Sequence, residues 1–197
     1  MLTLDQARNN MLEQITFPTQ IETLNLQQAA NRICAEDVIS PINVPSFDNS
    51  AMDGYAVRLA DLEKSLTLSV AGKSFAGIPF QGSWPDQSAI RIMTGAMIPE
   101  GADAVVMQEQ VNINEDGTIT FSELPKINQN IRRIGEDVKK GDIVLTQGDE
   151  LNAVSLPLLA SLGISEVKCY HRLKVAILST GDELVEVGKP LQIGQLY

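Results

Sequence analysis

Residues 41 to 137 consist of short β-branched runs separated by glycine and proline, and this pattern constrains the fold more than any other feature. Such runs are too short for typical helices and fit the pleated surface of a sheet. The runs cover residues 66–70, 89–93, 104–107 and 118–121. Asp116-Gly117 stands between residues 111–113 and 118–120 and predicts a β-hairpin. We therefore expect residues 41–137 to form a β-rich domain.

The segments on either side of this region contain helical patterns. Residues 3–15 predict an amphipathic helix, because apolar residues recur at spacings of three and four. Thr3 followed by Gln6 fits a capping box, and Pro18 is expected to end the helix. Gln and Ala favour a second short helix at 27–32, and residues 33–39 suit an extended chain. Residues 152–162 predict a third helix that Gly163 caps.

Charge and composition exclude several classes of function. The net charge of −10 argues against nucleic-acid binding, which requires clustered Lys and Arg. A single histidine and two distant cysteines, Cys34 and Cys169, do not make an ordinary zinc site. The sequence shows no signal peptide and no apolar run of membrane-spanning length. We therefore expect a cytoplasmic protein with both thiols free.

Residues 174–178 are apolar without interruption, which suits a strand buried on both faces of a parallel sheet. In such sheets, ligands bind beyond the carboxyl ends of the strands, where Asp182 and Glu183 follow here. Only about twenty residues follow this strand, so we expect it to open an α/β domain whose remainder is missing after Tyr197.

Four polar segments with turn chemistry carry the candidate site residues: 46–58, 91–106, 130–137 and 179–183. Acids beside Asn, Ser and Gly can build a cation or phosphate site, and Asp53-Gly54 predicts a tight turn. Arg132 and Arg133 can fork onto phosphate or carboxylate oxygens. Each segment alone also fits a solvated loop, a turn or a surface ion pair. Neither a GxSxG elbow nor a Walker or GxGxxG loop is present in the sequence.

Together, four strings in this order resemble the molybdopterin molybdenumtransferases, the MoeA and gephyrin E-domain family, over its amino-terminal portion. The strings are FDNSAMDGYA at 47–56, RIMTGA at 91–96, RRIGED at 132–137 and LSTGDEL at 178–184. The resemblance implies an enzyme of molybdenum cofactor biosynthesis. Its substrates are adenylylated molybdopterin and molybdate, AMP is released, and Mg²⁺ assists.

The resemblance also implies the site residues. Asp53, Thr94, Asp137 and Glu183 match the active-site positions, with Asp48, Asn49, Ser50 and Asp182 beside them as substrate-binding candidates. Asp137 and Glu183 are assigned to the metal or to molybdate placement. Asp53 is assigned to positioning or acid–base work, and Thr94 to donation towards an oxyanion.

The implied fold is α+β, β-rich and elongated, in a homodimer. Residues 1–40 and 138–171 would form a discontinuous first domain, 41–137 an inserted β-rich domain, and 172–197 the start of a truncated α/β domain. The cleft would lie between the first two domains of one subunit and the α/β domain of its partner, so we expect residues 1–197 alone to be inactive. Two alternatives stay open: a scaffold of the gephyrin type, and a magnesium-dependent phosphohydrolase indifferent to molybdate.

Overall fold

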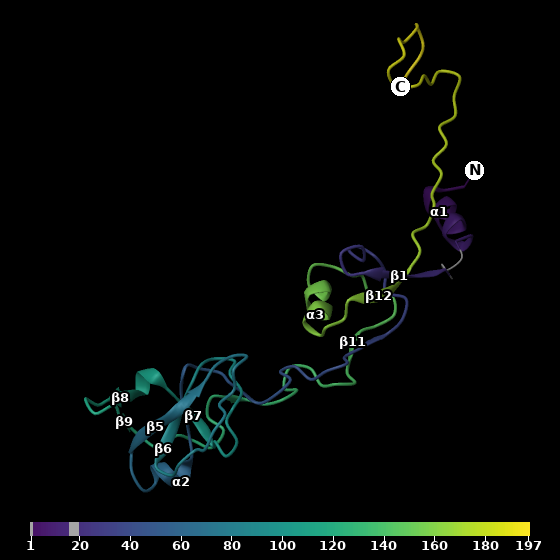
Figure 1. The fold of residues 1–197 in the computed structure, drawn as a ribbon. Helices are drawn as coiled ribbons and strands as arrows, with labels where there is room; N and C mark the ends of the chain where they lie inside the picture. The colour runs from purple at the N-terminus through teal and green to yellow at the C-terminus, as the bar shows by residue number, and fades with distance from the viewer. Residues whose placement is uncertain (1, 16–19) are drawn as a thin grey trace.

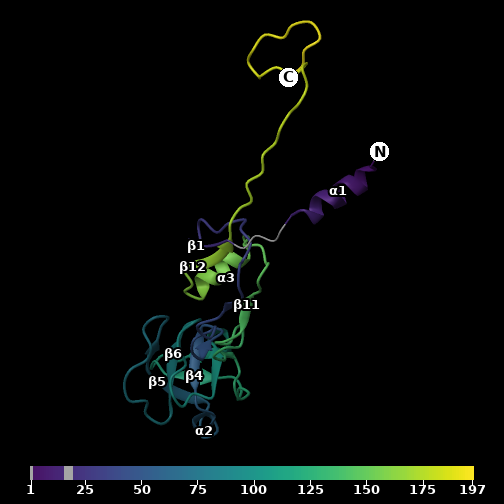
Figure 2. The same ribbon diagram turned by 90° about the vertical axis from the view of Figure 1, so that its right-hand side faces the viewer.

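The computed structural model describes residues 2–15 and 20–197. Figures 1 and 2 show an elongated molecule with a β-rich lobe at one end and a smaller region in the middle. Helix α1 (Leu4–Glu13) and the C-terminal segment lie beyond that smaller region, away from the lobe. The β-rich α+β class expected from the sequence is confirmed.

The lobe is built on one six-stranded mixed sheet with the order β7-β4-β6-β5-β9-β8. Its strands are β4 (Gly54–Val57), β5 (Thr67–Ser74), β6 (Ser88–Ile92), β7 (Ala104–Met107), β8 (Val111–Ile113) and β9 (Ile119–Phe121). Only the β5–β6 pair is parallel. The predicted hairpin is confirmed, because β8 and β9 pair antiparallel across Asp116-Gly117. Two short helical segments, α2 (Leu59–Leu62) and a 3-10 turn (Gln108–Gln110), complete the lobe.

Strand β4 is buried along its whole length, between β6 and β7. Alternate side chains enter two different cores, as the two-residue period of a strand requires. Tyr55 and Val57 pack on one face with Leu68 and Phe121, whereas Ala56 packs on the other face in the second core. The residue that precedes β4 is Asp53, so a strand buried on both faces fixes the backbone beside this carboxylate.

The smaller region joins the chain before the lobe to the chain after it. β1 (Ile21–Asn25) pairs antiparallel with β12 (Glu166–Tyr170), and β2 (Val38–Ile39) pairs with β11 (Ile143–Leu145). Helix α3 (Ser155–Ser161) packs on these strands through Leu159, which is fully buried. Gly163 follows α3 at φ 75°, which confirms the predicted cap. The domain boundaries expected from the sequence remain a prediction.

The expectations for the amino-terminal segment are confirmed at the start of α1 and wrong at residues 27–32. The Thr3 capping box is present, while Pro18 lies outside the described residues. Residues 27–32 form turns instead of a helix. Asn25 Oδ1 accepts from the Gln28 amide, Asn31 adopts φ 58°, and the Asn31 amide donates to Leu151. Tertiary hydrogen bonding therefore replaces the helical pattern that Gln and Ala favour.

The predicted strand at 174–178 is also wrong for this structure. Residues 171–180 have no regular secondary structure, and Val175, Ile177 and Leu178 are each at least 80% exposed. A strand requires a hydrogen-bonded neighbour, and within the described residues none pairs with this segment. The apolar side chains of this segment are consequently exposed to solvent.

Candidate functional site

Asp53 and Thr94 are brought together at one edge of the sheet. Asp53 directly precedes β4, and Thr94 lies in the turn that follows β6, the strand beside β4. The Thr94 amide and hydroxyl both donate to Asp53 Oδ1, each at 2.7 Å. These bonds, followed by the more distant Arg91 charge, hold the pKa of Asp53 below its usual value. Asp53 is therefore a carboxylate at neutral pH, with Oδ1 occupied.

The turn that carries Thr94 is fixed by the loop before Asp53. Gly95, at φ 76°, donates its amide to the Ser50 carbonyl, and the Ser50 amide donates to the Ala96 carbonyl. This reciprocal pair ties two segments that are far apart in the sequence. The expected strand-end position of Thr94-Gly95 is thus confirmed, and its glycine adopts a left-handed φ.

Gly54 does not form the predicted tight turn. Residues 51–53 make a bend, and Gly54 is already the first residue of β4, without a left-handed φ. A Cβ at this position would lie 2.0 Å from the Val106 carbonyl oxygen of β7. Glycine is needed here because two backbones approach closely, and this approach sets the position of Asp53.

Asp48 is held by backbone and side-chain donors from the loop after β10 (Ile131–Arg132). Its Oδ1 accepts from the Ile134 amide at 2.8 Å, and its Oδ2 pairs with Arg133. The Ile134 amide, then the Arg133 guanidinium, lower the pKa of Asp48. Both oxygens are engaged, so Asp48 acts here as a link between two loops.

Asn49 and Ser50, the other two substrate-binding candidates in this loop, form strand β3 (Asn49–Ser50), which pairs with β10. Both are buried, and Ser50 Oγ donates to the Met52 carbonyl at 2.6 Å. Their positions support the loop that leads to Asp53.

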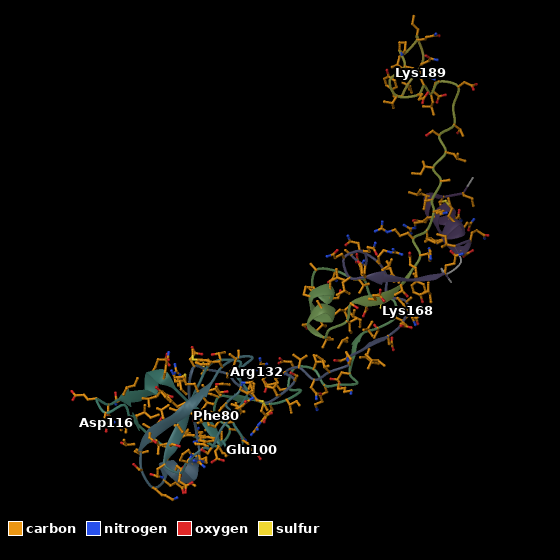
Figure 3. All side chains as sticks on the ribbon, in the orientation of Figure 1. Phe80, Glu100, Asp116, Arg132, Lys168 and Lys189 are labelled. Carbon is orange, nitrogen blue, oxygen red and sulfur yellow. The ribbon has the colours of Figure 1, made fainter. Side chains whose placement is uncertain are left out.

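Asp137 lies in the bend that follows β10 and is engaged by an arginine. Arg132 Nη2 donates to both oxygens of Asp137, at 2.7 and 2.6 Å, and Arg132 Nε donates to Glu136 at 2.6 Å. The Arg132 bond is the main cause that lowers the pKa of Glu136. Arg132 is labelled in Figure 3, on the side of the lobe that faces the smaller region. About half of the Asp137 side chain is exposed, so solvent and ligands reach this ion pair.

Glu183 and Asp182 lie far from the other candidate site residues of the same chain. Both are exposed and lie in the C-terminal segment, whose Lys189 is at the opposite end of the molecule from the lobe in Figure 3. Among the residues that the structure describes, no three His, Cys, Asp or Glu side chains converge as a metal site would require.

Arg91 is a polar residue of this site that no sequence signal singled out for a role. Its guanidinium donates to the Gly54 carbonyl at 2.7 Å, bonds Gln108, and lies 5.1 Å from the centre of the Tyr55 ring. A positive charge thus stands beside Asp53 although the whole chain is acidic. Detecting it would have required knowing that β6 pairs with β4.

The fold and site define a β-rich protein with a cluster of arginine-held carboxylates where the sheet meets the smaller region. The family model for the "MoeA N-terminal region (domain I and II)" matches residues 2–163. The chain therefore belongs to the MoeA family. Among the described residues, no helix combines the length and apolarity needed to cross a bilayer.

Named relatives agree with this assignment. The molybdopterin molybdenumtransferase of Haemophilus influenzae is 82% identical over 197 residues, which are all of this chain and 49% of the relative. The same enzyme of Staphylococcus aureus strain Mu50 is 38% identical over 88% of this chain and 42% of its own length. A molybdopterin biosynthesis MoeA structure from Pyrococcus horikoshii OT3 superposes with a TM-score of 0.85 at 35% identity, covering 96% of this chain and 51% of that one. The chain thus spans about half the length of the relatives it matches.

Proposed function

We propose that this chain supplies the amino-terminal half of the active cleft of a molybdopterin molybdenumtransferase. The reaction would insert molybdenum from molybdate into adenylylated molybdopterin and release AMP. The observation that carries the proposal is Asp53, whose Oδ1 is held twice by Thr94 at a rigid strand end. Among the residues that the structure describes, none forms a hydrogen bond or ion pair with Oδ2, which is left for a substrate or a cation.

Asp53 suits the role of an anchor for a cation or for substrate positioning. Its lowered pKa keeps it ionised at neutral pH, so it has no proton to give and is a weak base. The Thr94 hydroxyl donates its hydrogen bond to Asp53, so Thr94 is a positioning residue. Donation from Thr94 to an oxyanion, the role that the family resemblance suggests, would require this bond to break.

Arg132 provides the positive charge that anionic substrates need in an acidic chain. Its guanidinium now binds Asp137 and Glu136, and its fork geometry would equally suit phosphate oxygens. We propose that substrate phosphates take over this guanidinium, which frees Asp137. The exposure of the pair allows such an exchange without moving the core.

We propose Mg²⁺ as the assisting ion, held by Asp137 and Glu183. The donor chemistry fits, because Mg²⁺ commonly binds one or two carboxylates together with substrate phosphates and waters. When bound, it would polarise the pyrophosphate linkage. Because Glu183 and Asp182 lie far from Asp137 within one chain, we propose that a homodimer partner supplies them. The two free thiols agree with a cytoplasmic setting, which we also propose.

The test is AMP release from adenylylated molybdopterin by a full-length protein carrying this sequence, with Mg²⁺, in the presence and absence of molybdate. Asp53→Asn should reduce release at least 100-fold. Asp116→Asn is the matched control, because Asp116 likewise accepts from the amide and hydroxyl of one threonine, Thr118. Figure 3 places Asp116 at the far end of the lobe from Arg132, so this variant should retain full activity.

Three results would count against the proposal. Release that ignores molybdate indicates a phosphohydrolase. Substrate binding without release indicates a scaffold. Equal loss in both Asn variants shows that the effect arises from the fold and does not come from this site.

A further inference from the structure

The two cysteines of the chain face each other across an antiparallel bridge in the smaller region. Cys34 and Cys169 are direct partners, although 135 positions separate their numbers in the sequence. The hydrogen bonds that define the bridge are made by their neighbours: Ala35 to Lys168 at 2.9 Å and Tyr170 to Ile33 at 3.0 Å. The cysteines therefore form a non-hydrogen-bonded pair, the register in which opposing side chains lie closest.

Both thiols lie in the same core and are directed to the same end of the bridge. Cys34 and Cys169 are fully buried together with Leu151 and Leu159. Cys34 Sγ donates to the Glu36 carbonyl at 3.0 Å, and Cys169 Sγ lies 4.0 Å from the Val167 carbonyl. Glu36 follows Cys34 by two positions and Val167 precedes Cys169 by two, which in an antiparallel pair is the same end of the bridge. Directly opposed side chains of such a pair lie on one face, so the two thiols share one part of this core.

The spacing of such a pair matches what a disulfide requires. Directly opposed residues in a non-hydrogen-bonded pair have Cα atoms about 4.5 Å apart, inside the range of about 4.4–6.8 Å found in disulfides. Both cysteines are free thiols in this structure. We propose that Cys34 and Cys169 form an oxidation site, at which a peroxide converts the two thiols into an intramolecular disulfide.

The reaction balances with hydrogen peroxide as the oxidant. One cysteine, as its thiolate, attacks a peroxide oxygen, and the O–O bond breaks to give a sulfenic acid and hydroxide. The second sulfur then attacks the sulfenic sulfur, the S–O bond breaks, and water leaves. Two thiols and one peroxide yield one disulfide and two waters.

Burial controls the rate of this step. It raises the pKa of both thiols, which keeps the reactive thiolate scarce in the closed structure. Oxidation must therefore pass through a local opening of the bridge, and the same burial then shields the disulfide from reductants. The cross-link would join the two chain segments that lead into and out of the β-rich lobe, which closes a covalent loop around it.

The experiment is peptide mapping of the purified protein after exposure to hydrogen peroxide and alkylation of the remaining thiols under denaturing conditions. We expect one species in which the peptide with Cys34 is linked to the peptide with Cys169, and a thiol reductant should restore the separate peptides. The midpoint of thermal unfolding should rise by roughly 5–15 °C in the cross-linked protein, because a long loop is closed.

Recovery of both cysteines without the intramolecular disulfide would overturn the proposal. A purely packing role predicts that both cysteines are recovered as alkylated thiols, as sulfinic acids or in disulfides between molecules. Cys34→Ser and Cys169→Ser should each abolish the linked species. Because either substitution can disturb the core, the mapping of the unsubstituted protein decides the question by itself.

Discussion

Gly54→Ala is expected to damage both the sheet and the candidate site, because it adds a methyl group between two backbones. The new Cβ would lie 2.0 Å from the Val106 carbonyl oxygen and 2.8 Å from the Val106 carbonyl carbon. Real Cβ atoms essentially never come closer than 3.0 Å, so β4 and β7 must separate by about 1 Å. A separation of that size breaks neighbouring backbone hydrogen bonds, which normally span about 2.9 Å.

The cost follows from the bonds and packing that this separation removes. Two or three lost hydrogen bonds contribute about 0.5–1.5 kcal/mol each, and overpacking adds about 1–3 kcal/mol. The free energy of unfolding should fall by about 3–5 kcal/mol, which lowers the midpoint of thermal unfolding by roughly 10 °C in a chain of this size. Circular dichroism during heating measures this shift.

Gly72→Ala is the matched control, since Gly72 also lies in a strand of this sheet. Its added Cβ would meet the Phe80 ring, a partly exposed side chain that can rotate away. We expect a midpoint within about 4 °C of the original protein, in line with a cost near 1 kcal/mol. If Gly54→Ala is no more destabilising than Gly72→Ala, the close approach of β4 and β7 does not explain the glycine.

Two further predictions concern the carboxylates. Thr94→Ala should raise the pKa of Asp53 towards its ordinary value, whereas Thr94→Ser should keep this pKa low. NMR titration of the Asp53 carboxyl carbon measures the pKa in each variant, and equal values in both would refute a role for the hydroxyl. The folded-state pKa of Asp48 lies below its unfolded value of about 4. The contribution of Asp48 to the stability of the fold is therefore complete above about pH 4, and it is lost as the pH falls through the folded-state pKa. Asp48→Asn should therefore flatten the loss of stability below about pH 5 in acid unfolding curves, and an unchanged slope would contradict the assignment.

The sequence predicts correctly those elements whose hydrogen-bonding residues lie close together along the chain. The β8–β9 hairpin follows from Asp116-Gly117, and the start of α1 follows from Thr3 and Gln6. In both cases the stabilising bonds join residues only a few positions apart. The local sequence therefore contains all the information that determines these two elements.

The failed predictions concern segments whose conformation distant residues decide. At 27–32, helix propensity competes with a hydrogen bond from Asn31 to Leu151, which lies far along the chain. At 174–178, an apolar run has strand character but finds no partner among the described residues. At Asp53-Gly54 the glycine was expected to serve a tight turn. In the structure it is required because the Val106 backbone approaches too closely for a Cβ.

The candidate site was predictable in its residue types and not in its pairings. The bond between Asp53 and Thr94 joins residues 41 positions apart and exists because β4 and β6 are neighbours. The sequence left phosphate or carboxylate as the partner of Arg132, and in the fold Arg132 binds Asp137 through two hydrogen bonds. A carboxylate with both oxygens on one guanidinium offers little to a cation, so in the proposed reaction substrate anions would engage Arg132 before Asp137 could bind Mg²⁺. The proposed reaction then requires phosphate binding to precede metal binding at Asp137.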